Sequence, residues 1–98
     1  MTDIASVKLK RDIAKIADHY GQTQFKKCVE ELDELKEAIY LHIASGYSEE
    51  TESHVNEEVA DVEIMTAQLK MLMNSEDIVD GIKQFKVDRQ LGRIERGE

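Results

Sequence analysis

The chain contains no proline in its 98 residues and only five glycines. Proline breaks the hydrogen-bond ladder of a helix and glycine weakens it, so a chain poor in both can be helical nearly from end to end. Glutamate, lysine, leucine, isoleucine and alanine are abundant, which favours the same structure. We therefore predict an all-α fold in which residues 1–98 form one domain. A chain this short buries a modest core, which partner chains would help to complete.

Hydrophobic periodicity and turn residues divide the chain into four predicted helices. Their expected ranges are about 3–19, about 23–44, from Thr51 or Ser53 to Met73, and from the residue after Ser75 to about Glu95. Gly21 should end the first helix, and the segment 45–48 is the clearest loop. Ser75, which two acidic residues follow, is expected to cap the last helix.

Apolar residues recur at helical spacing and predict the buried faces. The predicted core stripe of the second helix consists of Phe25, Val29, Leu32, Leu35, Ile39 and Ile43. On the last helix, Ile78, Ile82 and Phe85 form the predicted inward stripe. The third helix is apolar almost all round, and such a helix is buried almost all round. We infer that one of its stripes faces the protomer core and that another faces a second chain.

The formal net charge of −8 limits the partners. An acidic surface disfavours nonspecific binding to nucleic acid or to anionic membranes. No segment has the roughly 18 apolar residues of a membrane span, and the first residues lack the apolar run of a secretory signal. The one cysteine, Cys28, cannot form an internal disulfide and is expected to be a small core residue. We therefore expect a soluble protein of the reducing cytoplasm.

Two acidic pairs stand about 27 residues apart, on the second and third predicted helices. They are Glu31 with Glu34 and Glu58 with Asp61, and each pair places two carboxylates about one helical turn apart. Apolar residues surround both pairs, so the like charges would repel unless a cation lay between them. Four convergent carboxylates suit a hard divalent cation, which predicts a Mg²⁺ site, with Mn²⁺ as an alternative ion. A solvated acidic surface is the other interpretation.

A basic strip continues the apolar stripe of the last predicted helix. It consists of Lys86, Arg89, Arg93 and Arg96. In an acidic chain this strip predicts a phosphate contact, above all at Lys86 and Arg89. For Arg93 and Arg96 the alternative is a helix end that complements the helix dipole. The chain has no Glu-x-x-His pair, CxxC, HExxH or glycine-rich phosphate loop, so di-iron, zinc and P-loop sites are disfavoured.

Two segments resemble the motifs of the MazG-type nucleotide pyrophosphohydrolases, which belong to the all-α NTP pyrophosphatase superfamily. They are His19-Tyr20-Gly21 through Gln24 to Val29-Glu30-Glu31-Leu32-Asp33-Glu34-Leu35-x-x-Ala38-Ile39, and Glu57-Glu58-Val59-Ala60-Asp61-Val62-x-Ile64-Met65. The likeness covers roughly residues 16–94, and the short chain resembles single-domain forms found in phages and bacteria.

This resemblance implies a fold and a reaction. The fold is a four-helix MazG-like bundle completed by oligomerisation into a homodimer or tetramer. The reaction is the hydrolysis of a nucleoside triphosphate between its α and β phosphates, which gives a monophosphate and pyrophosphate. Such an activity controls the nucleotide pool or removes noncanonical nucleotides. The base and sugar of the substrate stay open.

The resemblance also implies roles for individual residues. The positions that match the family's magnesium ligands are Glu31, Glu34, Glu58 and Asp61. Glu31 and Glu34 are the candidate catalytic carboxylates, with Glu34 accepting a proton from the attacking water.

Three further residues match positions that bind substrate. Lys86 and Arg89 stand where the family grips phosphates, and Gln24 is a candidate for contacting the substrate near the metal. Two rival functions remain open at this point. One is phosphoribosyl-ATP pyrophosphohydrolase of the same superfamily, and the other is a noncatalytic helical protein whose acidic face docks a basic partner.

Overall fold

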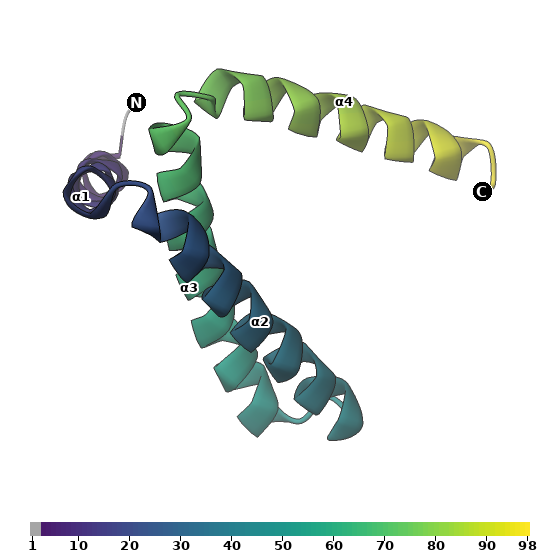
Figure 1. The fold of residues 1–98 in the computed structure, drawn as a ribbon. Helices are drawn as coiled ribbons and strands as arrows, with labels where there is room; N and C mark the ends of the chain where they lie inside the picture. The colour runs from purple at the N-terminus through teal and green to yellow at the C-terminus, as the bar shows by residue number, and fades with distance from the viewer. Residues whose placement is uncertain (1–2) are drawn as a thin grey trace.

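The computed structural model describes residues 3–98, which form four helices (Figure 1). They are α1 (Ile4–Tyr20), α2 (Thr23–Ala44), α3 (Glu49–Leu72) and α4 (Glu76–Glu95). No strand occurs in this range, which confirms the predicted all-α class. In the same range, no helix combines the length and the apolar character that crossing a lipid bilayer requires.

The first two helices have almost the predicted bounds, and the third begins earlier. α1 ends at Gly21, whose φ of 61° glycine adopts without steric cost. α3 begins at Glu49 and not near Thr51 or Ser53. The reason is that Ser48 caps it, since the Ser48 hydroxyl accepts a hydrogen bond of 3.3 Å from the backbone N–H of Thr51.

Ser75 occupies the cap position of α4, as predicted, but its side chain makes no capping hydrogen bond. Its hydroxyl oxygen is instead buried, without a hydrogen-bond partner among residues 3–98. The acidic residues Glu76 and Asp77 lie in the first turn of α4, where their charges complement the helix dipole. The start of α4 is thus favoured by charge and not by the predicted serine cap.

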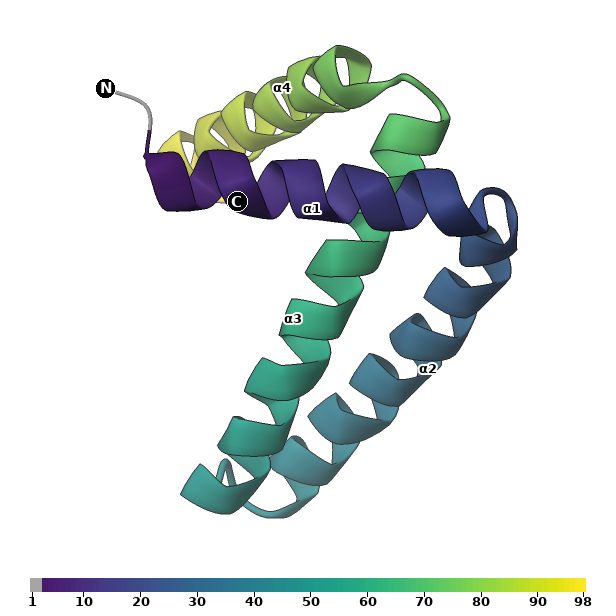
Figure 2. The same ribbon diagram turned by 90° about the vertical axis from the view of Figure 1, so that its left-hand side faces the viewer.

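Helices α2 and α3 form a long antiparallel hairpin, and α1 lies across α3 near the start of α2 (Figure 2). The buried side chains where the two hairpin helices meet are small or polar, except for one methionine. They are Gln24, Cys28, Glu31 and Ala38 from α2, and Glu58, Met65 and Gln68 from α3. We call this set the seam. Its members recur at spacings of three, four or seven, so each set occupies one face of its helix. The prediction that Cys28 is a small core residue is confirmed.

The predicted apolar stripe of α2 is not the core of a single chain. Leu35 is half-buried, and the other members, Phe25, Val29, Leu32, Ile39 and Ile43, are exposed. The buried face is the neighbouring one, where side chains as small as those of Cys28 and Ala38 let α3 approach closely. The core prediction for α2 is therefore wrong for one chain, and the stripe lies on the outside of the hairpin.

Within residues 3–98, helix α4 meets the other helices only near its start and then extends away from the hairpin (Figure 1). Lys10 of α1 forms an ion pair of 3.1 Å with Glu76 in its first turn. None of the residues of α4 is buried, so the predicted inward stripe of Ile78, Ile82 and Phe85 is wrong for one chain. The Cα radius of gyration is 16.4 Å, larger than the ~13 Å of a compact domain of this length. A single chain thus leaves α4 without a packing partner along most of its length.

Candidate metal centre

Three carboxylates from the two hairpin helices converge. One carboxylate oxygen each of Glu31, Glu34 and Glu58 lies within 4.8 Å of the other two. Glu31 and Glu34 are one turn apart on α2, and Glu58 projects from the seam face of α3. The antiparallel pairing of the helices therefore brings together three of the four carboxylates that the sequence singled out.

Two of these carboxylates are buried and only partly satisfied. Glu31 is 9% exposed and Glu58 is 8% exposed. Each has one oxygen, Oε2, that is buried without a hydrogen-bond partner in the part of the chain that the structure describes. A buried anionic oxygen without a donor is costly and rare, and a bound cation satisfies it. Burial and convergence together give this cluster the properties of a cation site.

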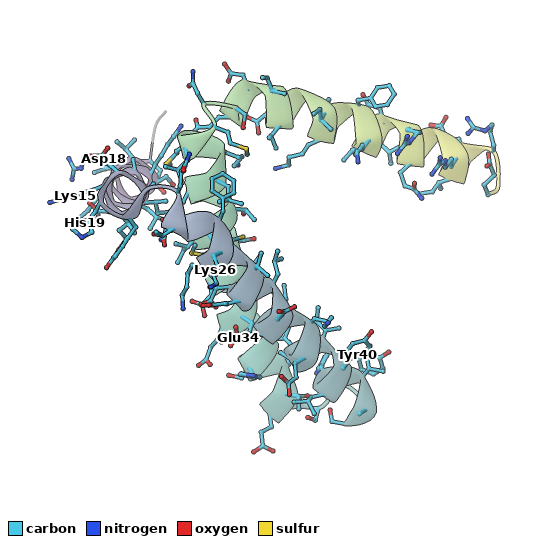
Figure 3. The ribbon with its side chains drawn as sticks, in the orientation of Figure 1. Lys15, Asp18, His19, Lys26, Glu34 and Tyr40 are labelled. Atoms are coloured by element: carbon cyan, nitrogen blue, oxygen red, sulfur yellow. The ribbon has the colours of Figure 1, made fainter. Side chains whose placement is uncertain are left out.

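Glu34 is the solvent-exposed member of the cluster, and Figure 3 shows that it lies on the hairpin, away from α4. The negative charge of Glu31 raises the pKa of Glu34 above its ordinary value, and partial desolvation and the charge of Glu58 act in the same direction. The main cause of this shift in pKa is the repulsion between the charge of Glu34 and that of Glu31. A cation placed among the three oxygens would remove that repulsion.

The positive charge nearest to the cluster belongs to Lys27, which sequence analysis did not single out. Its Nζ atom lies 3.4 Å from Glu31 Oε1 and 3.6 Å from Glu30 Oε2. The contact with Glu31 is the main cause that raises the pKa of Lys27. The available signal was the spacing, since a lysine four residues before a glutamate lies on the same face of a helix.

Three more residues of the predicted site do not belong to the cluster in a single chain. Asp61 is exposed on α3 and does not belong to the converging group. Lys86 and Arg89 are exposed on α4, which does not contact α2 within residues 3–98. The guanidinium carbon of Arg89 instead lies 5.8 Å from the ring centroid of Phe85 on the same helix. One chain alone therefore leaves Asp61 outside the converging group, one turn after Glu58, and places neither Lys86 nor Arg89 beside the carboxylates.

Gln24, the predicted substrate contact, is buried in the seam. Its Nε2 donates a hydrogen bond of 2.8 Å to Gln68 Oε1 on α3. Gln68 is 1% exposed, and its Nε2 contacts the carbonyl of Ile64 at 3.4 Å. The amide of Gln24 thus links α2 to α3 in this structure. The role of Gln68 was not predicted, although the available signal was a polar residue three positions after Met65, on the face of Glu58.

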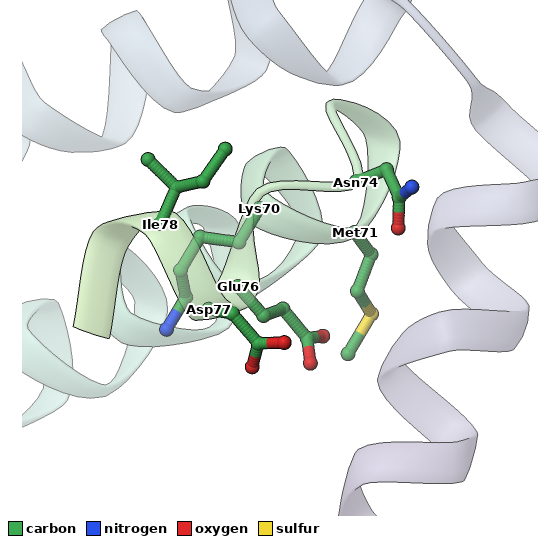
Figure 4. Close-up of a pocket in the computed structure, with 6 residues that line it drawn as sticks. All are labelled: Lys70, Met71, Asn74, Glu76, Asp77 and Ile78. Carbon is green, nitrogen blue, oxygen red and sulfur yellow. The ribbon is translucent and has the colours of Figure 1, made fainter. Parts of the chain in front are cut away.

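A cavity of about 540 Å³ lies at the turn between α3 and α4 and not at the carboxylates (Figure 4). Its lining consists of Lys70, Met71, Asn74, Glu76, Asp77 and Ile78. Charges of both signs line this cavity. Among residues 3–98, the only converging group of three metal-binding side chains is the carboxylate cluster of the hairpin, which lies outside the cavity. We attribute this hollow to the departure of α4 from the hairpin.

Comparison with known proteins gives no further guide, because no protein-family model, no curated protein and no solved structure matches the chain. The class of site is therefore defined by its own geometry. It is an all-carboxylate cluster, partly buried, between two antiparallel helices.

Proposed function

We propose that this chain is a Mg²⁺-dependent nucleoside triphosphate pyrophosphohydrolase with a MazG-like fold. The observation that carries the proposal is the convergence within 4.8 Å of carboxylate oxygens from Glu31, Glu34 and Glu58. Acidic residues on helices are usually solvated, whereas two of these three are buried and have an oxygen without a partner among the described residues. The same residues belong to the two segments that resemble the family's motifs.

The donor set suits magnesium or manganese. All three residues offer carboxylate oxygens, which hard cations prefer, whereas zinc and copper sites use histidine or cysteine. Magnesium in enzymes that act on phosphates is commonly held by a few carboxylates together with substrate oxygens and water. A cluster with two buried members and one exposed member is compatible with that arrangement. Asp61, one turn after Glu58, remains a proposed fourth ligand.

The residues of the cluster take different parts in the proposed reaction. When bound, the cation neutralises phosphate oxygens and makes water more acidic. Glu31 on α2 and Glu58 on α3 would hold the cation. Glu34 is proposed as the base that accepts the proton of the attacking water, because it is the exposed carboxylate of the three. The products are a nucleoside monophosphate and pyrophosphate.

We also propose that a second copy of the chain completes the fold and the site. In a single chain, Phe85 of α4 is 66% exposed, and every other apolar side chain of the helix except that of Val79 is 49–65% exposed. The outer face of α2 is apolar too, and it carries a hollow of about 340 Å³. The lining of this hollow consists of Leu32, Leu35, Lys36, Ile39 and Tyr40. Unpartnered apolar faces of this size favour association, which supports a homodimer or tetramer.

Charge favours the same arrangement. The basic strip of α4 and the acidic hairpin attract each other, so α4 of one copy suits the hairpin of another. This packing would carry Lys86 and Arg89 of one copy toward the carboxylates of its partner. There the two side chains would bind the triphosphate, with the guanidinium group able to hold two oxygens at once.

The activity is tested by product analysis. Incubation with a panel of canonical and modified NTPs and dNTPs is expected to give equal amounts of pyrophosphate and monophosphate with millimolar Mg²⁺, and neither product with chelator. Mn²⁺ should replace Mg²⁺, because it accepts the same oxygen donors. Ion-exchange chromatography separates these products from the phosphate and diphosphate that cleavage at the γ phosphate would give.

Two results would redirect or overturn the proposal. Hydrolysis of phosphoribosyl-ATP and of no nucleoside triphosphate would establish the related alternative activity. Inactivity toward both, together with an unfolding temperature that Mg²⁺ does not raise, would favour the noncatalytic interaction protein. The second criterion holds because a ligand that binds only the native state must stabilise it.

The role of α4 in assembly is tested by an exposed apolar residue. Ile82→Asp should dissociate the oligomer, because it places a charge in the proposed interface while Ile82 is 49% exposed in the single chain. Sedimentation velocity measures the change in mass. Gln90→Asp is the matched control, since Gln90 is a polar, exposed residue of the same helix. Equal masses for the two variants would remove the evidence for α4 as the interface.

A further inference from the structure

Lys27 neutralises one oxygen of the cluster without entering it. Its Nζ lies 3.4 Å from Glu31 Oε1, while Glu31 Oε2 is buried without a hydrogen-bond partner among residues 3–98. The side chain of Lys27 is 51% exposed and that of Glu31 is 11% exposed. The carboxylate is therefore fixed in the seam, whereas the ammonium group reaches it from the solvent side and is free to move.

The ammonium of Lys27 and a divalent cation compete for the same carboxylate. Two positive charges in contact with one glutamate repel each other, and at distances of a few ångströms this repulsion is substantial. Once Glu31 binds a cation, Lys27 loses its ion pair with Glu31. A triphosphate at the cation brings new anionic oxygens, and an ammonium group binds such oxygens well.

We propose that Lys27 is an exchangeable counter-ion, which neutralises Glu31 in the metal-free protein and moves to a phosphate group of the substrate when the cation binds. The inference rests on the proposed function, because it requires the carboxylates to bind a divalent cation. It adds a phosphate-binding residue within the same chain, separate from Lys86 and Arg89 on α4. Lys27 therefore weakens cation binding before the substrate arrives and binds a phosphate group of the substrate afterwards.

The test compares Lys27→Gln with Lys26→Gln. Lys26 is the neighbouring exposed lysine (Figure 3), and it forms no ion pair within residues 3–98. Both variants remove one positive charge from the same turn of α2, so general electrostatic effects cancel in the comparison. The first readout is the Mg²⁺ affinity of the nucleotide-free protein, from calorimetric titration. The second is the KM for a nucleoside triphosphate at saturating Mg²⁺.

The two readouts should move in opposite directions for Lys27→Gln. Without the competing ammonium, Mg²⁺ binds about three- to tenfold more tightly. Without the phosphate contact, KM rises by about tenfold. Lys26→Gln should change neither value by more than about twofold. A purely structural role for the ion pair would not produce this opposite movement.

Each other pattern overturns the inference. If the Mg²⁺ affinity is the same in the two variants, Lys27 does not compete with the cation for Glu31. If affinity rises and KM stays constant, Lys27 does not transfer to the substrate. If the unaltered protein binds no Mg²⁺ at all, the proposed function fails together with the inference, so the two failures are distinguishable.

Discussion

Replacing Glu58 by glutamine is expected to lower pyrophosphate release by at least about a hundredfold and, at the same time, to raise the stability of the metal-free protein. The loss of activity follows because glutamine has nearly the same shape as glutamate but lacks the negative charge that the proposed metal ligand requires. The gain in stability follows because Glu58 is a buried carboxylate beside two others, with one oxygen that no described residue binds. Neutralising such a group removes repulsion and desolvation that a neutral amide does not suffer.

The stability change should be about 1 kcal/mol or more, which corresponds to roughly 4 to 8 °C in unfolding temperature for a domain of this size. Thermal unfolding in the presence of chelator measures it. Glu57→Gln is the matched control, because Glu57 is the preceding residue and its side chain is 75% exposed. It should leave both activity and unfolding temperature nearly unchanged. A Glu58→Gln protein with full activity, or one that is less stable without metal, would contradict the assignment of Glu58.

Two inactive variants are expected to restore each other's activity when their subunits are mixed. One is Glu58→Gln, and the other carries Lys86→Ala and Arg89→Ala together. If α4 of one copy serves the carboxylates of another, a mixed assembly contains some sites that have neither change. In a dimer that contains one chain of each kind, one of the two sites has neither change, so this mixed dimer is expected to have about half the activity of the unaltered protein.

This experiment separates contributions from the same chain and from the partner. If the basic strip served the carboxylates of its own chain, every site in the mixture would carry a defect and the activity would stay near that of the separate variants. Subunits must exchange for the comparison, so the two chains are co-expressed with different tags and the mixed species is isolated through both. Activity below a few hundredths of the unaltered protein in that species would overturn the proposed exchange of α4.

The helices were predictable because their ends are determined locally. Gly21 and the loop 45–48 interrupt the backbone at the places the sequence indicated, and α2 has the expected bounds. The core was not predictable from apolar periodicity. In α2 the most apolar face lies outside, whereas the seam uses Cys28, Ala38 and polar side chains. Hydrophobicity alone does not show whether an apolar face packs within one chain or is left for another.

The candidate site was predictable to the extent that it depends on spacing along one helix. Glu31 and Glu34 share a face of α2 for that reason, and the antiparallel hairpin then brings Glu58 to them. The pairing of Gln24 with Gln68 was not predictable, because it depends on how the two helices align. The separation of α4 from the hairpin was also missed, since it depends on the backbone between α3 and α4.

The buried hydrogen bond between Gln24 and Gln68 fixes the register in which α2 and α3 pack against each other. A slide of α3 by one turn would keep small side chains in contact, but it would strand two buried amides at a cost of about 1–3 kcal/mol each. The same slide would move Glu58 away from Glu31 by one helical pitch. Gln24 lies seven residues before Glu31 and Gln68 lies ten residues after Glu58, so this hydrogen bond is remote from the carboxylates. The alignment of Glu58 with Glu31 at the candidate metal centre is therefore fixed by a neutral contact about two to three helical turns away from the carboxylates.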